Sequence, residues 1–108
     1  MTVQELKDRL SLTVFSLPDP DRAVEGGYAG DLLSWVMGRA QPECAWLTIM
    51  SSVNVCAVAV LADVACVILT EGVIPDADLL SRAQAQGVNL LGTASSTFDA
   101  AADLRALL

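Results

Sequence analysis

The chain has 108 residues and carries 6 basic and 13 acidic side chains, for a formal net charge of −7. This charge argues against the basic surface that nucleic acids and anionic membranes require of a partner. The chain contains no histidine, which excludes Ser-His-Asp and Cys-His nucleophile systems and histidine-bearing zinc sites. A chain of this length holds one hydrophobic core, so we expect a single domain over residues 1–108.

Hydrophobic residues make up 54% of the chain, so some of them must lie at or near the surface of so small a domain. This predicts either a homodimer or an apolar ligand cleft. The cysteines Cys44, Cys56 and Cys66 form no CxxC pair, and the last two lie in apolar runs. This pattern indicates buried free thiols and a reducing, cytoplasmic location, and it leaves the reactivity of Cys44 open.

The stretch from residue 45 to residue 62 is uncharged and approaches the length of a membrane-spanning helix. Four polar residues cluster in its middle, Asp63 ends it, and neither end carries a basic anchor. A strand, a polar turn and a buried helix therefore explain this stretch better than a membrane span.

The first half of the chain predicts two helices and two strands. Thr2 and Glu5 form a capping box, so a short helix opens the chain. Residues 12–16 alternate apolar and hydroxyl side chains, as in a strand. After a proline-rich turn, residues 24–28 form a candidate strand weakened by two glycines, and Asp31 is the expected N-cap of the next helix.

The second half alternates strands and helices with short connections. The predicted elements are, in order, a strand over residues 45–49, a helix capped by Asn54, a strand over 64–69, a helix from Asp76 to Gly87, a strand over 88–91 and a helix capped by Ser96. This order predicts a parallel sheet with helices on its faces. The expected fold is a small three-layer αβα domain with a mostly parallel sheet.

Polar loops follow the predicted strands, over residues 26–31, 50–54, 70–72 and 92–96. Ligands of open parallel sheets bind beyond the carboxyl ends of the strands, and free N–H groups at helix starts favour an anion. The same residue types also serve as helix caps and turns, so a ligand site and a purely structural role both remain open.

The glycine-rich segment 26–30 is neither a GxGxxG motif nor a phosphate loop, and Lys7 is the only lysine. Its glycines permit a close approach of a ligand or of another backbone, and Tyr28 is suited either to stacking on a base or to packing. Asp31 and Glu71 are a candidate carboxylate pair for a cation or for acid-base chemistry, although their spacing carries no metal signature. The alternative is that Asp31 caps a helix and Glu71 is solvated.

The segment Gly27–Ala40, together with residues 45–49, 54–59 and 68–72, resembles the DRTGG domain family, and in particular its stand-alone members. The resemblance extends from residue 10 to residue 107 and implies a small three-layer α/β fold. Related domains form the N-terminal part of HPr kinase/phosphorylase or lie between CBS modules in some pyrophosphatases. The resemblance therefore implies a regulatory or assembly role without catalysis, and we expect no cofactor and no metal.

Two departures from the family pattern stand out. The name motif is interrupted, because three residues separate Asp21-Arg22 from Gly26-Gly27. The histidine that the family pattern implies before Asn54 is replaced by Ser52. From the loops and the resemblance together, the predicted ligand-binding residues are Gly27, Tyr28, Gly30, Asp31, Ser34, Ser52, Asn54, Thr70, Glu71 and Gly72.

Two functions compete. The first is a non-catalytic regulatory module that binds a small polar ligand, such as a nucleotide, at the carboxyl ends of the strands, with Arg22 and Arg39 as the basic residues expected to meet a phosphate. The alternative is a structural module that dimerises or docks on a partner protein and binds no small ligand; Trp35 and Trp46 fit core packing or a dimer contact. An enzyme that uses carboxylates ranks last, because no catalytic motif is present.

Overall fold

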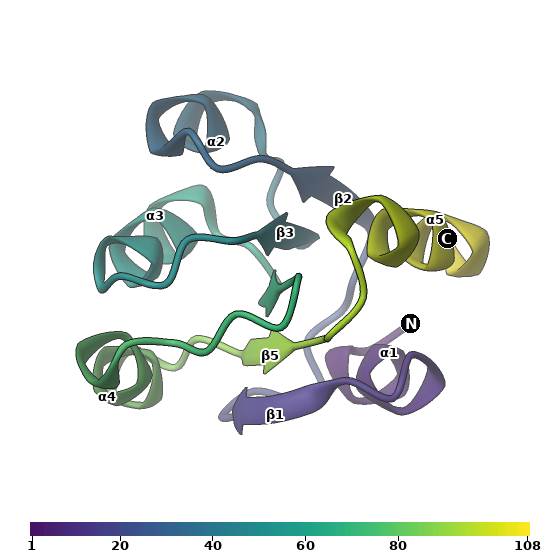
Figure 1. Ribbon diagram of the computed structural model, residues 1–108, viewed down its shortest axis with the longest axis horizontal. Coiled ribbons are helices and arrows are strands. Elements are labelled where there is room, and N and C mark those ends of the chain that lie inside the picture. Colours follow the sequence, from purple (N-terminus) through teal and green to yellow (C-terminus); the bar gives the residue numbers. More distant parts are fainter.

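A five-stranded sheet in the order β1-β5-β4-β3-β2 lies between two helix layers in the computed structural model, which describes all 108 residues (Figure 1). The strands are β1 (Thr13–Ser16), β2 (Gly26–Ala29), β3 (Cys44–Thr48), β4 (Cys66–Leu69) and β5 (Leu90–Gly92). The helices are α1 (Val3–Arg9), α2 (Leu33–Arg39), α3 (Asn54–Ala62), α4 (Ala77–Gln86) and α5 (Thr97–Leu107). The predicted three-layer α/β fold is confirmed.

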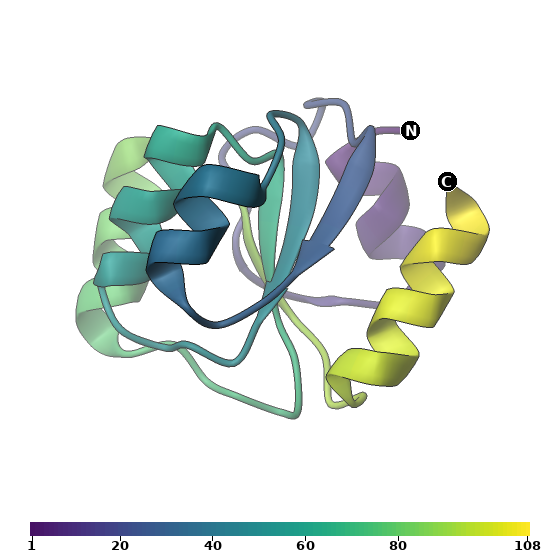
Figure 2. The ribbon, with the colours of Figure 1, turned by 90° about the horizontal axis from the view of Figure 1, so that it is seen from above.

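Strands β2 to β5 run parallel, and each pairs with the next strand along the chain. Right-handed crossovers that step in one direction place their helices on one face, so α2, α3 and α4 form one layer. Helices α1 and α5 cover the opposite face, as Figure 2 shows. The remaining strand, β1, pairs antiparallel with β5 at one edge of the sheet.

The helix ends agree with the sequence pattern at some caps and differ at others. Thr2 and Glu5 form the predicted capping box, Ser96 accepts a hydrogen bond from the N–H of Asp99 at 3.0 Å, and Gly87 ends α4 in the left-handed conformation. Asn54, however, is the first residue of α3 rather than its cap, and the start of that helix has no side-chain cap. Asp76 is the N-cap of α4 by position only, without a side-chain hydrogen bond.

Successive residues of the buried strands point to opposite faces of the sheet and fill two separate cores. Trp46 packs with α2, α3 and α4, whereas Ala45 and Leu47 pack with α1 and α5. The Trp46 indole N–H donates to the carbonyl of Gly30 at 2.9 Å, which fixes the end of β2 beside β3. Trp46 is thus a core residue, as one of the sequence interpretations proposed.

All three cysteines are free and buried, which confirms the prediction for Cys56 and Cys66. Cys44 is only 2% exposed, so its position near a loop does not make it accessible. Burial raises the pKa of each thiol, and it raises that of Cys66 to about 12. The uncharged stretch divides into β3, a loop and α3 as predicted, and no helix combines the length and apolar character needed to cross a bilayer.

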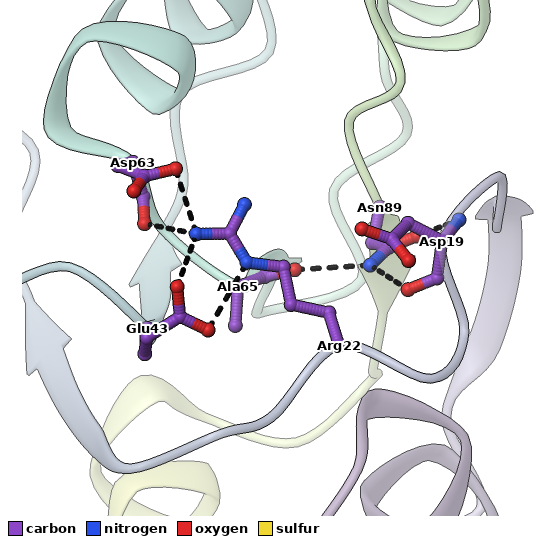
Figure 3. Close-up of polar contacts among 6 residues, drawn as sticks. All are labelled: Asp19, Arg22, Glu43, Asp63, Ala65 and Asn89. Carbon is purple, nitrogen blue, oxygen red and sulfur yellow. Dashed lines mark hydrogen bonds and ion pairs between the residues drawn. The ribbon is translucent and has the colours of Figure 1, made fainter.

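The amino ends of the parallel strands are tied together by the segment that precedes β2 (Figure 3). Arg22 donates to the carboxylates of Glu43 and Asp63 at 2.6 and 2.7 Å, just before β3 and β4. Asn89, just before β5, donates to the carbonyls of Asp19 and Ala65 at 2.7 and 3.0 Å. Arg22 therefore has a structural role, because it joins the segments before β3 and β4 at the edge opposite the strand carboxyl ends.

Candidate functional site

The carboxyl ends of β2 to β5 lie along one edge of the sheet, which we call the carboxyl edge. The loops at this edge cover residues 30–32, 49–53, 70–76 and 93–96. They contain most of the ligand-binding residues predicted from the sequence. The hydrogen bonds of each loop decide which of those residues remain free to meet a ligand.

Asp31 connects the ends of β2 and β3. Its carboxylate accepts hydrogen bonds from the Thr48 hydroxyl at 2.8 Å and from the N–H of Ile49 at 2.9 Å. Thr48 is fully buried, and its hydroxyl oxygen accepts in turn from the N–H of Met50 at 3.2 Å. The prediction that Asp31 caps α2 is wrong: Leu32 is the N-cap, because the Asp31 carboxylate finds better donors at the end of the neighbouring strand.

The loops after β4 and β5 lead to opposite helix layers, which makes their junction the topological switch point where a ligand is expected. At this junction, the polar groups of the two loops and of the start of α5 bond to one another. Glu71 accepts from the N–H of Thr97 at 2.9 Å, and the hydroxyls of Thr70 and Thr97 share a hydrogen bond of 2.6 Å. The N–H groups of Glu71 and Gly72 donate to carbonyls of the loop after β5. Glu71 thus occupies the start of α5 as an anionic ligand would.

Of the remaining predicted residues before β3, only Gly27 and Tyr28 line a hollow, of about 150 Å³, which they share with α5. Gly27 leaves room for α5, because a Cβ there would lie 2.7 Å from the Leu104 Cδ2 atom. Tyr28 packs against the core on the side of α2 to α4, and its ring lies beside Gly30. Ser34 is an exposed residue of α2. The carboxylates of Asp31 and Glu71 bind different elements, and the structure brings together no group of three metal-ligating side chains.

The loop from β3 to α3 has free backbone donors, as has the start of α2, where the N–H groups of residues 31–34 also make no hydrogen bond. Of these two runs of donors, only the one at α3 adjoins a hollow of the structure. The backbone N–H groups of residues 51–54 make no hydrogen bond to any backbone or side-chain acceptor. Ser52 is half-buried and Asn54 is exposed at this point. These two predicted site residues lie next to free donors at the start of a regular helix, as Asp31 and Ser34 do at the start of α2.

A groove of about 420 Å³ begins at this loop and runs between α3 and α4. Its lining residues are Val53, Asn54, Cys56, Ala57, Val60, Leu61, Arg82 and Gln86. A second hollow of about 330 Å³ is lined by Asp78 and Ser81 and shares Val53 and Arg82 with the groove. Together they place one basic side chain near the start of α3.

The sequence points to Arg22 and Arg39 as the residues to meet a phosphate and does not point to Arg82. Arg22 is held by Glu43 and Asp63 at the opposite edge of the sheet. Arg39 lies over the ring of Trp35, with its Cζ 3.8 Å from the ring centroid. Nothing in the sequence marks Arg82, because its position beside Asn54 results from the packing of α4 against α3.

The helix layer around the groove also carries exposed apolar side chains. Leu61 of α3 is 70% exposed, and Trp35 of α2 is 51% exposed. Helix α3 has no charged residue from Asn54 to Ala62, although one of its sides faces solvent. An exposed apolar helix face of this kind is typical of a contact surface.

Comparison with known proteins identifies the family. The family model of the DRTGG domain matches residues 42–107, more than half of the chain. The chain belongs to the DRTGG domain family. The resemblance drawn from the sequence is thereby confirmed, although the match begins after the Gly27–Ala40 segment that carried part of it. No curated protein matches the sequence.

The fold of this DRTGG domain is similar to a solved regulatory region. That structure is the crystal structure of the CBS and DRTGG domains of the regulatory region of Clostridium perfringens pyrophosphatase, complexed with the activator diadenosine tetraphosphate. The TM-score is 0.68 at 13% identity, and the likeness at this identity shows the fold alone. It covers 94% of this chain and 44% of the other, so this chain spans less than half of that regulatory region.

Proposed function

We propose that this DRTGG domain is a non-catalytic regulatory module that binds a small polar ligand of the nucleotide class where β3 leads into α3. The observation that carries the proposal is the run of free backbone N–H groups over residues 51–54, beside the largest groove of the molecule. Donors at a helix start are a favourable position for an anionic group.

Five of the ten predicted site residues have a role in this proposal, and they divide into two groups. Ser52 and Asn54 lie at the free donors and contact the ligand. Asp31, Thr70 and Glu71 hold the neighbouring loops in place through their own hydrogen bonds. The pyrophosphatase region of similar fold was solved with a nucleotide activator, which supports a nucleotide as the first ligand class to test.

The chemistry of the side chains supports binding without catalysis. The chain has no histidine, its three thiols are buried, and burial raises the thiol pKa values. The carboxylates of Asp31 and Glu71 accept hydrogen bonds from backbone N–H groups, which leaves neither as an unengaged acid or base. General acid-base catalysis requires a group within reach of a substrate proton.

A thermal-shift screen tests the ligand-binding function. The panel holds adenine and guanine nucleotides, coenzymes, sugar phosphates and divalent cations at fixed protein concentration. A ligand that binds only the folded state adds about 2.7 kcal/mol at one hundred times its Kd. We expect a concentration-dependent rise in Tm with a nucleotide, and a flat response across the panel up to millimolar ligand would overturn the proposal.

A second candidate function is assembly, favoured by the exposed apolar side chains of Trp35 and Leu61 on one helix layer. This function predicts a dimer at micromolar concentration, which Leu61→Gln weakens. Phe98→Gln is the matched control, because Phe98 is 83% exposed on α5 in the opposite helix layer. Sedimentation equilibrium measures the oligomeric state of the native chain, Leu61→Gln and Phe98→Gln. A native chain that is monomeric at micromolar concentration would rule out the assembly function.

A further inference from the structure

The groove between α3 and α4 combines apolar and polar lining. Cys56, Ala57, Val60 and Leu61 provide its apolar part, and Asn54, Arg82 and Gln86 provide its polar groups. Its volume of about 420 Å³ lies in the range of about 300–1,000 Å³ typical of small-molecule sites. A groove of this kind suits a ligand with one apolar part and one charged part.

Arg82 provides the charge that selects the ligand. The ion pairs of the protein engage Lys7 and Arg22, and Arg39 lies over Trp35, whereas Arg82 makes neither contact. Asp78 lies four residues earlier on α4 and lines the adjoining hollow, but it does not pair with Arg82. The guanidinium is therefore free to form charge-assisted hydrogen bonds with an anion.

The guanidinium and the free donors lie close enough to act on one ligand. Arg82 and Val53 line both hollows, and Arg82 and Asn54 line the larger one. The charge of Arg82 also acts on the Cys56 thiol in the second residue after Asn54, where it opposes the rise in pKa that burial causes. The first turn of α3 has no acidic residue that would repel an anion.

We propose that the α3–α4 groove binds a mononucleotide-sized phosphate ester, with its phosphate on Arg82 and the N–H groups of residues 51–54 and its base on Ala57, Val60 and Leu61. This inference rests on the proposed ligand-binding function and adds the location, the anion-binding arginine and the apolar contact for the base. It assigns the binding role to a residue that lies outside the carboxyl edge.

Titration calorimetry with ADP tests the assignment on the native chain and on Arg82→Gln. Loss of the charge-assisted contacts weakens ADP binding by about tenfold or more. Arg9→Gln is the matched control, because Arg9 is also an exposed arginine without an ion pair, lies on α1 in the other helix layer and lines no hollow. The control is expected to bind ADP within about twofold of the native chain.

Two further titrations separate the phosphate from the base. Adenosine, which lacks the phosphate, is expected to bind at least about tenfold more weakly than ADP. Asp78→Asn removes a negative charge from the adjoining hollow, which Arg82 also lines, and is expected to strengthen ADP binding. Equal binding of adenosine and ADP would overturn the role of Arg82 in holding a phosphate.

Backbone amide NMR locates the site independently of affinity. Addition of ADP is expected to shift the amide signals of residues 51–57 and 82–86 and to leave those of α5 unchanged. If ADP binds but Arg82→Gln has no effect, or if the shifts lie elsewhere, the groove assignment fails while the ligand-binding function stands. If another compound raises Tm and ADP does not bind, the nucleotide assignment alone fails. If no compound binds, both proposals fail.

Discussion

The carboxyl edge and the α3–α4 groove meet at the start of α3, but their polar groups are satisfied in different ways. At the carboxyl edge, Asp31 joins β2 to β3, and Glu71 closes the junction between β4 and α5. At the start of α3, where the carboxyl edge meets the groove, the N–H groups of residues 51–54 and the guanidinium of Arg82 have no partner within the chain. The closed region holds the fold, and the open region is available to a ligand.

The difference shows that polar residues after a strand do not by themselves form a site. Almost every buried polar group in a folded protein finds a partner. The loops after β4 and β5 bond to each other, and the Asp31 carboxylate in the loop after β2 bonds to the end of β3. Glu71 is the clearest case, because its carboxylate sits at the first N–H of α5, where a bound anion would otherwise be stabilised. A candidate site is better located where free donors adjoin a hollow, as at the start of α3; the free donors of residues 31–34 at the start of α2 line no hollow.

The closed region predicts its largest effect at Asp31. Asp31→Ala leaves the buried Thr48 hydroxyl and the N–H of Ile49 without an acceptor, so we expect a loss of about 2 kcal/mol in unfolding free energy. Urea denaturation of the native chain and of Asp31→Ala measures this change in unfolding free energy. Asp31→Asn retains an acceptor oxygen and is expected to recover more than half of the loss. Equal losses for both variants would show that the charge, not the hydrogen bonds, matters.

A smaller loss is expected at Thr70, which is fully buried and shares a hydrogen bond with Thr97. Thr70→Val preserves the shape but leaves the Thr97 hydroxyl unpaired, at a cost of about 1.5 kcal/mol. Thr13→Val in β1 is the control, because Thr13 is exposed and its hydroxyl makes no hydrogen bond. A control that loses as much stability as Thr70→Val would contradict the role of this contact.

Glu71→Ala is expected to cost about 1 kcal/mol, the usual contribution of a helix cap. Glu71 has a φ of 61°, and alanine carries the same strain there, so the change reports the lost acceptor for the Thr97 N–H. Glu25→Ala provides the comparison, because Glu25 is an exposed acid whose side chain makes no hydrogen bond. Amide exchange of Thr97 should accelerate in Glu71→Ala alone.

The sequence predicts most of the fold because the buried strands and the helix boundaries have local causes. The apolar run of residues 64–69 requires burial on both faces, and the short alternating connections require a parallel sheet. Caps such as Ser96 depend on residues three positions apart. Asp31 is mispredicted because its donors lie on another strand, 17 residues away in the case of Thr48.

The site is less predictable than the fold because its decisive contacts join residues that lie far apart in the sequence. Ser52 and Asn54 are visible in the sequence as polar residues between a strand and a helix. Whether their backbone N–H groups stay free depends on which long-range acceptors reach them, and no local pattern encodes that. Arg82 stands six residues into α4, and only the packing of α4 against α3 brings it to the groove.

The open region predicts the smallest effect on stability. Arg82→Gln removes no ion pair and no hydrogen bond, so the unfolding free energy should stay within about 0.5 kcal/mol of the native value. The same urea experiment applied to Asp31→Ala and Arg82→Gln therefore separates a residue that holds the fold from one that remains free. A loss above about 1 kcal/mol in Arg82→Gln would show that the guanidinium already has a structural partner. In that case Arg82 would belong to the satisfied polar groups that hold the fold, and it would not be free to bind a ligand.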